Sequence, residues 1–423
     1  MTALFIRVTL FVAFLLPVTT GYFSVNYSFL FYALFIALQA KRIEKPGKLL
    51  LAAIAVYAAI YLVGLGFDIF APQAMLLRRG VSFAIFMTMF AFAVVPFGAL
   101  ETRAFKIAVV AVSFGFSIYA ISRFYSVGGN SYGFSLKDVS GSQRYGFVYL
   151  LAIFCVITTH GSERWFRVGR AITLFVILAG LLLTFSRSSI VALGCVLPLF
   201  LLAPFVAHVQ RDISRLAAVG RRTGIAAIYT IALFAIFPVT FQFYGDLILS
   251  RYAPMMEVAK DPMDAIKGQG KIAASLAPDQ PLIAEGSEGT RLKIWKTIIT
   301  HTVAHPVNGS SYLGAWYLDG VKTGSAHSQY FDVLLRTGIP GAILYLLILG
   351  QVLLFLWRKE PGLFWGTLAV LVFGLFHETF KESQGAFILA CLIGMYSAYT
   401  KAVPVRAQAT VETALPAPLA QQT

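Results

Sequence analysis

Continuous apolar runs, separated by short polar stretches, recur along the whole chain. Continuous rather than alternating apolar residues favour helices over strands. A run of about 20 residues matches the roughly 30 Å of hydrocarbon that a transmembrane helix crosses. The pattern predicts an all-α polytopic membrane protein with about twelve transmembrane helices. They are expected at residues 3–20, 27–40, 48–66, 80–99, 104–122, 145–160, 168–185, 188–207, 223–244, 338–357, 362–378 and 385–401.

The composition agrees with a membrane protein. Of 423 residues, 58% are hydrophobic and 13% are charged, whereas soluble domains carry about 25% charged residues. The net charge of +15 does not indicate nucleic acid as a partner, because Lys and Arg form short clusters between apolar runs. Such clusters orient a membrane protein and contact the headgroups of membrane lipid. The three cysteines lie inside apolar runs without CxxC spacing, so they predict neither a disulfide nor a metal site.

The distribution of Lys and Arg predicts the topology. Most of them follow even-numbered spans, so the positive-inside rule places both termini in the cytoplasm. We therefore expect spans one to nine at residues 1–244 and a periplasmic loop at 245–326, with an amphipathic helix at 291–303. A helix at the membrane surface and the last three spans follow at 327–402. The tail at 403–423 is expected to be disordered and cytoplasmic.

Arg187 joins two apolar runs with almost no loop between them, and Ser186 and Ser188 flank it. It is either an arginine that snorkels to the headgroups or a guanidinium that binds a phosphate with two parallel hydrogen bonds. Arg291, near Trp295, belongs to the predicted amphipathic helix. Arg291 lies either on a solvated basic face of that helix or, as a second cation, in the same cavity as Arg187.

His327 opens the predicted surface helix. Asp332 and Arg336 are four residues apart and are expected to pair. Pro340, in the sequence Gly338-Ile-Pro340-Gly341, predicts a sharp turn before span ten. His327 is either a structural hydrogen-bonding residue or a general base, since the ordinary pKa of a histidine lies near working pH.

A fourth cluster lies between the last two spans, at His377, Glu378, Lys381 and Glu382. It is either an interfacial charge network or part of a site for a polar headgroup. His377 and Glu378 lack the second histidine of a zinc protease motif, so no metal is predicted. All four clusters fall on the outer face of the predicted topology. Two arginines, a histidine and nearby hydroxyls would suit an anionic lipid headgroup and an acceptor hydroxyl.

Three of these stretches resemble the bacterial O-antigen ligase and polymerase superfamily, over roughly residues 168–400. Residues 183–187 look like its TxSR turn. Arg291 and Trp295, followed by His305-Pro306 and Gly309, resemble the Arg-x3-Trp, His-Pro and Gly pattern of its large periplasmic loop.

The third stretch is the most specific. His327-Ser328, nine further residues and then Gly338-Ile-Pro340-Gly341 fit the ligase pattern H-[NSQ]-x9-G-x-x-[GTY]. Ser328 stands where relatives more often have Asn, and the pattern admits Ser.

The resemblance implies a GT-C-like membrane glycosyltransferase of the bacterial inner membrane. The donor would be a glycan on undecaprenyl diphosphate, and the acceptor a sugar hydroxyl of lipid A–core on the periplasmic face, which completes lipopolysaccharide. His327 would correspond to the essential histidine, and Arg187 and Arg291 to the essential arginines. A base at His327 would activate the acceptor hydroxyl, and the arginines would stabilise the departing diphosphate. We expect inversion and no metal or other cofactor. The residues expected to bind substrate are Ser186, Ser188, Trp295, Ser328, Tyr330, His377 and Lys381.

Three alternatives remain. An O-antigen polymerase would join two lipid-linked glycans. A protein O-oligosaccharyltransferase of the same superfamily usually has a longer chain with an extra C-terminal domain. A lipid or solute transporter would more often show internal repeats and broken helices near the bilayer midplane, and the sequence shows neither.

Overall fold

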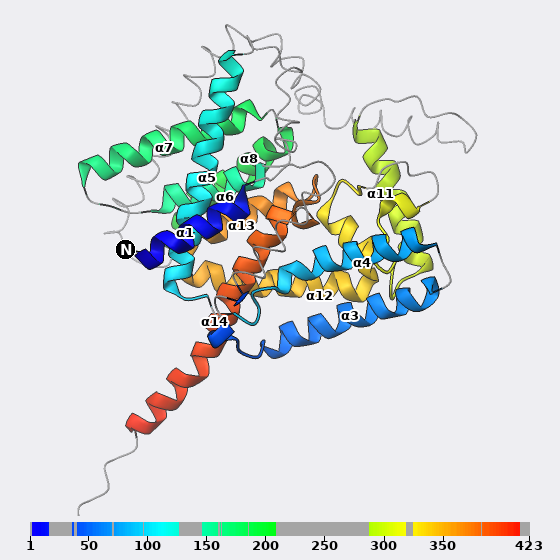
Figure 1. Cartoon of the computed structure of the whole chain (residues 1–423). Helices are drawn as coiled ribbons and strands as arrows, with labels where there is room; N and C mark the ends of the chain where they lie inside the picture. The colour runs from blue at the N-terminus through cyan, green and yellow to red at the C-terminus, as the bar shows by residue number, and fades with distance from the viewer. Residues whose placement is uncertain are drawn as a thin grey trace, which may run out of the picture. The chain divides into compact units, whose positions relative to one another are not determined.

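The computed structural model describes residues 2–16, 36–37, 40–69, 72–95, 97–126, 146–159, 161, 163–184, 186–208, 287–318, 325–381 and 383–414 (Figure 1). Within these ranges all regular secondary structure is helical. The expected all-helical class is thereby confirmed for this part of the chain. The predicted span at 223–244, most of the span at 27–40 and the first part of the periplasmic loop lie outside the described residues.

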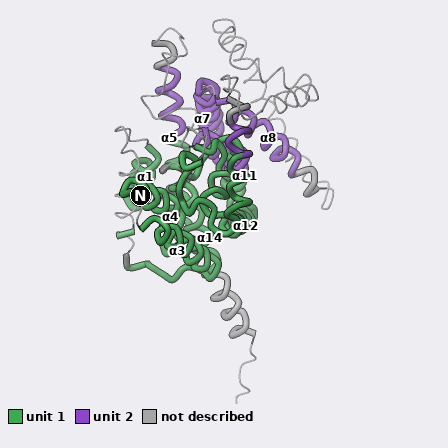
Figure 2. The backbone as a smooth tube through the Cα atoms, turned by 90° about the vertical axis from the view of Figure 1, so that its right-hand side faces the viewer, with its two compact units in different colours: residues 1–112, 297–364, 374–423 green, residues 113–296, 365–373 purple. Residues whose placement is uncertain are grey.

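The chain divides into two compact units (Figure 2). Unit 1 comprises residues 1–112, 297–364 and 374–423, and unit 2 comprises residues 113–296 and 365–373. Helices α5 (Ala99–Ser126), α11 (Ser287–Ala304) and α13 (Pro361–Phe373) contribute residues to both units. The other helices of unit 1 are α1 (Thr2–Leu15), α3 (Lys48–Asp68), α4 (Gln73–Met87), α12 (Gln329–Lys359) and α14 (Ser383–Ala414), with the 3-10 turns η2 (Ala40–Arg42), η3 (Thr88–Phe90), η7 (Ala315–Tyr317) and η8 (Thr379–Lys381). The other helices of unit 2 are α6 (Gly146–Thr158), α7 (Arg164–Leu183) and α8 (Arg187–His208).

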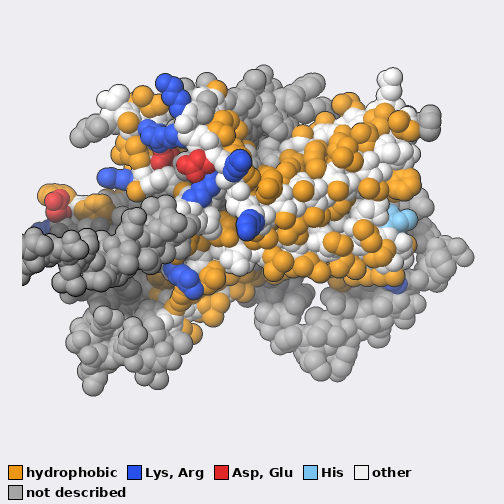
Figure 3. Space-filling view, turned by 90° about the horizontal axis from the view of Figure 1, so that it is seen from below, with side chains coloured by type: hydrophobic (Ala, Val, Ile, Leu, Met, Phe, Trp, Pro, Cys, Tyr) orange, Lys and Arg blue, Asp and Glu red, His pale blue; other side chains and the backbone are white. Residues whose placement is uncertain are grey.

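Four of the described helices are long and apolar enough to cross a membrane: α3, residues Ala99–Ser122 of α5, α7 and α12. Shorter apolar helices are α1, α6, α13 and residues Ser188–Ala203 of α8. Large apolar side chains also lie exposed, as on α3, where Phe67 is 77% exposed. Figure 3 shows such side chains spread over one face of the molecule. An exposed apolar surface of this extent indicates contact with lipid. The number of twelve spans stays a prediction.

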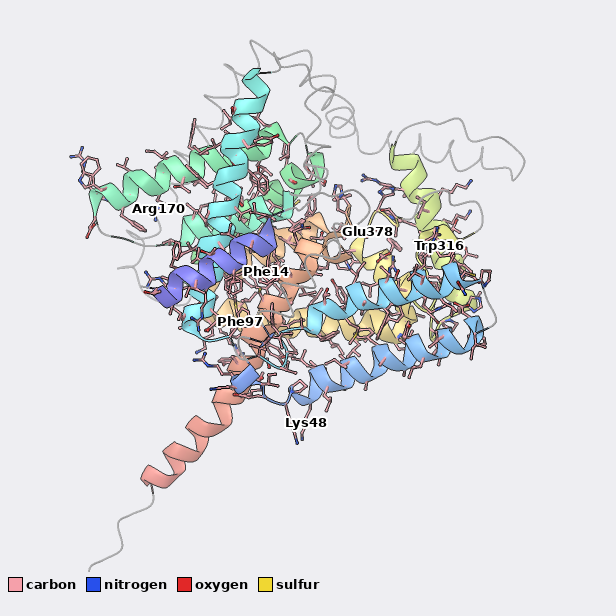
Figure 4. The ribbon with its side chains drawn as sticks, viewed as in Figure 1. Phe14, Lys48, Phe97, Arg170, Trp316 and Glu378 are labelled. Carbon is pink, nitrogen blue, oxygen red and sulfur yellow. The ribbon has the colours of Figure 1, made fainter. Side chains whose placement is uncertain are left out.

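Unit 1 has an aromatic core where α1, α5 and α14 meet. The ring centroids of Phe14 and Phe387 are 4.6 Å apart, and Phe11 packs edge-on against Phe105 at 6.0 Å. Phe97, labelled with Phe14 in Figure 4, lies 5.9 Å from Phe11. Burial of these large rings stabilises the unit, because each removes roughly 150–250 Å² from solvent.

The segment predicted as a span at 80–99 differs in the structure. Helix α4 already begins at Gln73 and ends at Met87, and η3 follows at once. No helix continues through the described residues 91–95 and 97–98. Pro96 gives the physical reason, because its ring excludes the preceding turn of an α-helix. The apolar side chains of this stretch are buried instead, and Phe92 packs edge-on against Phe387 of α14.

Unit 2 is built around α6, of which every residue from Gly146 to Val156 is buried. A helix that is apolar on all sides is typical of a protein interior or a membrane span. Helices α7 and α8 pack against it. Ser113 of α5 donates a hydrogen bond to the backbone carbonyl of Val148, with the two oxygens 3.3 Å apart.

Candidate active site

His327 stands immediately before α12 in a strained backbone conformation. Its φ of +54° lies in the left-handed region, which few residues other than glycine adopt. Its backbone N–H donates to Ser325 Oγ at 3.2 Å. Ser328 is the N-cap, buried and extended, and its carbonyl accepts the Asp332 N–H at 3.0 Å. Strained residues of this kind cluster at functional sites, and His327 is half-buried.

The segment at residues 374–381 is hydrogen-bonded to the start of α12. Gln329 donates its N–H to the Gly374 carbonyl at 2.8 Å and accepts the Phe380 N–H on Oε1 at 2.7 Å. The Glu378 carboxylate accepts the N–H of Ala326, the residue before His327. The structure therefore brings together two clusters that the sequence left separate, those of His327 and of His377.

Glu378 belongs to the fourth cluster of the sequence but was not among the residues expected to bind substrate or to act in catalysis. It is buried, only 9% exposed, and is labelled in Figure 4. Its contact with Ala326 bridges 52 positions of the chain, a separation that no local pattern encodes. Its neighbour His377 is half-buried. The sequence did contain one signal for Glu378: it is an ionisable residue at the predicted outer boundary of the membrane, and such residues are functional candidates by default.

The predicted pair of Asp332 and Arg336 is confirmed. Arg336 Nε lies 2.7 Å from Asp332 Oδ2, and both side chains are buried. The guanidinium also donates from Nη1 to the Tyr312 carbonyl at 3.1 Å and interacts favourably with the charge of Glu378. The pair therefore links the first turns of α12 to the loop before it.

The predicted turn before span ten is a kink at Gly338, which has φ +66° and ψ −170° inside α12. Ile339 donates its N–H to the Pro306 carbonyl at 2.8 Å. A Cβ on Gly338 would lie 2.6 Å from the Val307 carbonyl oxygen, so both the backbone angle and the close approach require glycine. The His305-Pro306 and Gly338 stretches, predicted as separate motifs, thus contact each other.

Helix α11 carries Arg291 and Trp295, both half-buried. The predicted helix at 291–303 is confirmed, within bounds that are slightly wider. Ile294 and Ile298 are buried on one side, while Leu292, Ile299 and Val303 are exposed on another. The helix thus has one apolar face in the protein interior and a second, exposed apolar stripe.

Two histidines lie side by side, with their rings tilted by 41°, where α11 ends. The rings of His301 and His305 have centroids 4.8 Å apart. Burial lowers the pKa of His301, and the neighbouring His305 lowers it further. Both effects favour a neutral His301 at neutral pH.

Arg187 is the first residue of α8. Its side chain is not among those that the structure describes. Ser186 caps this helix: its Oγ accepts the Ser189 N–H at 3.4 Å and the Ser189 hydroxyl at 2.7 Å. Ser188 Oγ, half-exposed, lies 3.4 Å from Ser186 Oγ. Substrate binding by these serines stays a prediction. The N-terminus of a helix favours an anion, because its first N–H groups lack helical partners.

The site residues fall in both units. Unit 1 holds the residues around His327, and unit 2 holds both candidate arginines. Tyr330, on the first turn of α12, is half-buried, and Lys381 ends η8 with its side chain outside the description. Among the described residues, no three His, Cys, Asp or Glu side chains are grouped as a candidate metal site.

One family model matches the chain. It is described as O-antigen ligase and covers residues 172–346. The matched segment includes Arg187, α11 and the stretch from His327 to the Gly338 kink, and it ends before Glu378. A comparison with curated proteins finds no match. Residues 172–346 therefore match the O-antigen ligase family, and over these residues the resemblance that the motifs predicted is confirmed.

Proposed function

We propose that the protein is an O-antigen ligase, which transfers a glycan from undecaprenyl diphosphate to a sugar hydroxyl of lipid A–core. The family match already indicates an enzyme that transfers glycosyl groups. The observation that supports the specific ligase reaction is the geometry around His327. A strained, half-buried histidine heads a kinked helix. Three sets of hydrogen bonds hold that position: His327 donates its N–H to Ser325, Ala326 donates its N–H to Glu378, and Gln329 bonds to Gly374 and Phe380.

In the proposed reaction, the acceptor hydroxyl attacks the anomeric carbon of the donor. The hydroxyl proton passes to His327 while the new glycosidic bond forms. The bond from the anomeric carbon to the diphosphate oxygen breaks, and its electrons leave with the lipid diphosphate. Arg187 and Arg291 stabilise the charge that develops on this leaving group. A single displacement inverts the anomeric configuration. The diphosphate departs readily beside two arginines, so the proposal requires no metal.

The transfer assay tests this proposal directly. Purified protein is incubated with undecaprenyl diphosphate-linked glycan and lipid A–core, with a chelator and no added metal. We expect lipid A–core bearing the glycan as the product. Lengthened lipid-linked glycan alone would instead assign the polymerase reaction, and glycan on an added acceptor protein would assign the protein O-oligosaccharyltransferase reaction. Movement of donor across proteoliposomes without a new bond would assign transport.

We further propose that the site faces the periplasm, with both termini in the cytoplasm. The alternation of Lys and Arg between loops supports this orientation. In a background with Cys155, Cys195 and Cys391 replaced by alanine, single cysteines at Lys271 and Arg215 provide the measurement. An impermeant thiol reagent applied to spheroplasts should label position 271 and spare position 215. Equal labelling of both would contradict the orientation.

A further inference from the structure

A turn at residues 309–312 in unit 1 has an unusual backbone. Gly309, Ser311 and Tyr312 have φ values of +55°, +46° and +71°. Residues other than glycine persist in this region only where the surrounding structure imposes it. The turn follows the His305-Pro306 stretch that contacts the Gly338 kink. The contacts that hold the 309–312 turn therefore bear on how the loop meets α12.

A buried ion pair holds the turn from one side. Arg79 of α4 is 3% exposed, and its Nε and Nη2 lie 2.7 and 2.6 Å from Oδ2 of Asp68, the last residue of α3. Its Nη1 donates to the backbone carbonyls of Ser310, at 3.1 Å, and Ser311. Gly64 of α3 makes room for this arrangement, because a Cβ there would overlap the guanidinium.

A second Asp–Arg pair holds the turn from α12. Arg336, paired with Asp332, donates from Nη1 to the Tyr312 carbonyl at 3.1 Å, and the Tyr312 N–H donates back to the Arg336 carbonyl at 3.0 Å. The Ser310 N–H donates to the Leu335 carbonyl at 2.6 Å. Two arginines on different helices thus bind three consecutive carbonyls, those of residues 310 to 312.

Arg336 is also connected to the segment that holds His327. Its guanidinium is attracted electrostatically by the Glu378 carboxylate, and this carboxylate accepts the N–H of Ala326, next to His327. A buried ion pair is weak evidence for stability, because its desolvation offsets the attraction, and its better attested use is to fix one arrangement. The fork of arginine suits this use, since one side chain serves a carboxylate and two carbonyls at once.

We propose that Asp68 and Arg79 are positioning residues for the His327 site: they fix the 309–312 turn against α12, and thereby the strained start of that helix. Neither residue lies in the matched family segment. The inference rests on the proposed function, in which His327 acts on the acceptor hydroxyl.

Arg79→Lys tests the inference, because lysine keeps the charge beside Asp68 but loses the fork that reaches the turn. We expect kcat for transfer to fall by about 10- to 100-fold, the effect of a small misplacement of a reacting group. The KM for the lipid-linked donor should stay unchanged. The matched control is Arg78→Lys, one residue earlier. The guanidinium carbon of Arg78 lies 4.4 Å from the ring centroid of Trp316, and within the described residues Arg78 makes no hydrogen bond to the 309–312 turn. This variant should keep the wild-type kcat.

Rates are taken per folded molecule, at a temperature well below the unfolding midpoint of each variant, because a purely structural role would change only the folded amount. A wild-type kcat in Arg79→Lys, or equal losses in both variants, would overturn the inference. If Arg79→Lys does not fold, Asp68→Asn tests the same pair. A reduced kcat there supports positioning, whereas a wild-type kcat or failure to fold overturns it. A nearly wild-type rate in His327→Ala would instead contradict the role of His327 in the proposed function.

Discussion

Replacement of His327 by alanine is expected to lower the transfer rate by a factor of about 10²–10⁴, the usual contribution of a positioned acid or base. The physical reason is the loss of the group that accepts the proton of the attacking hydroxyl. Protein level and donor binding should stay near wild type, since the arginines remain. Alanine keeps the Cβ that strains the backbone at φ +54°, so the rate is taken per folded molecule to separate catalysis from stability.

The measurement is transfer rate against pH for wild type, His327→Ala and His327→Gln. Glutamine forms hydrogen bonds but does not accept a proton at neutral pH, so a nearly wild-type rate in His327→Gln would make His327 an orienting residue. A nearly wild-type rate in His327→Ala would remove the catalytic assignment. His305→Ala is the comparison, since His305 is exposed and packs at a tilt against His301. We expect it to retain more activity than His327→Ala.

Local patterns in the sequence predicted the local parts of this site. The apolar runs gave the positions of α3, α7 and α8, because hydrophobic periodicity and length are properties of a single segment. The Asp332–Arg336 pair followed from a spacing of four on one helix. The kink at Gly338 followed from glycine and proline, whose backbone preferences hold in any fold.

The remaining features depend on contacts between distant segments. The hydrogen bond from Ala326 to Glu378 and the contact from Arg79 to Ser310 join residues 52 and 231 positions apart. No periodicity encodes such partners. The predicted span at 80–99 was misplaced for a related reason: hydrophobicity shows that Phe92 is buried, but packing against Phe387 buries it without a helix.

The second large effect is expected at Arg187 and Arg291. Their proposed role is to stabilise the diphosphate as it leaves, and the loss of one such donor typically costs about 10²–10³ in kcat. Lysine keeps the charge but presents a single ammonium in place of a planar fork, so it does not bind two phosphate oxygens in parallel. We therefore expect Arg187→Lys and Arg291→Lys each to lower kcat strongly, with alanine at either position lowering it further.

Separate kcat and KM values for the donor decide what the arginines do. A contact that strengthens as charge develops lowers kcat and kcat/KM together when it is lost, whereas a contact made equally with the bound donor raises KM alone. Arg170→Lys is the matched control, because Arg170 lies on α7 (Figure 4), in the same unit as Arg187 and Arg291. Its Nη1 donates to the Thr159 carbonyl at 2.6 Å. We expect Arg170→Lys to leave both constants unchanged. Full activity of both lysine variants would contradict the phosphate fork and leave plain charge at the membrane surface as the role of Arg187 and Arg291. A rise in KM alone would restrict them to holding the donor before the reaction.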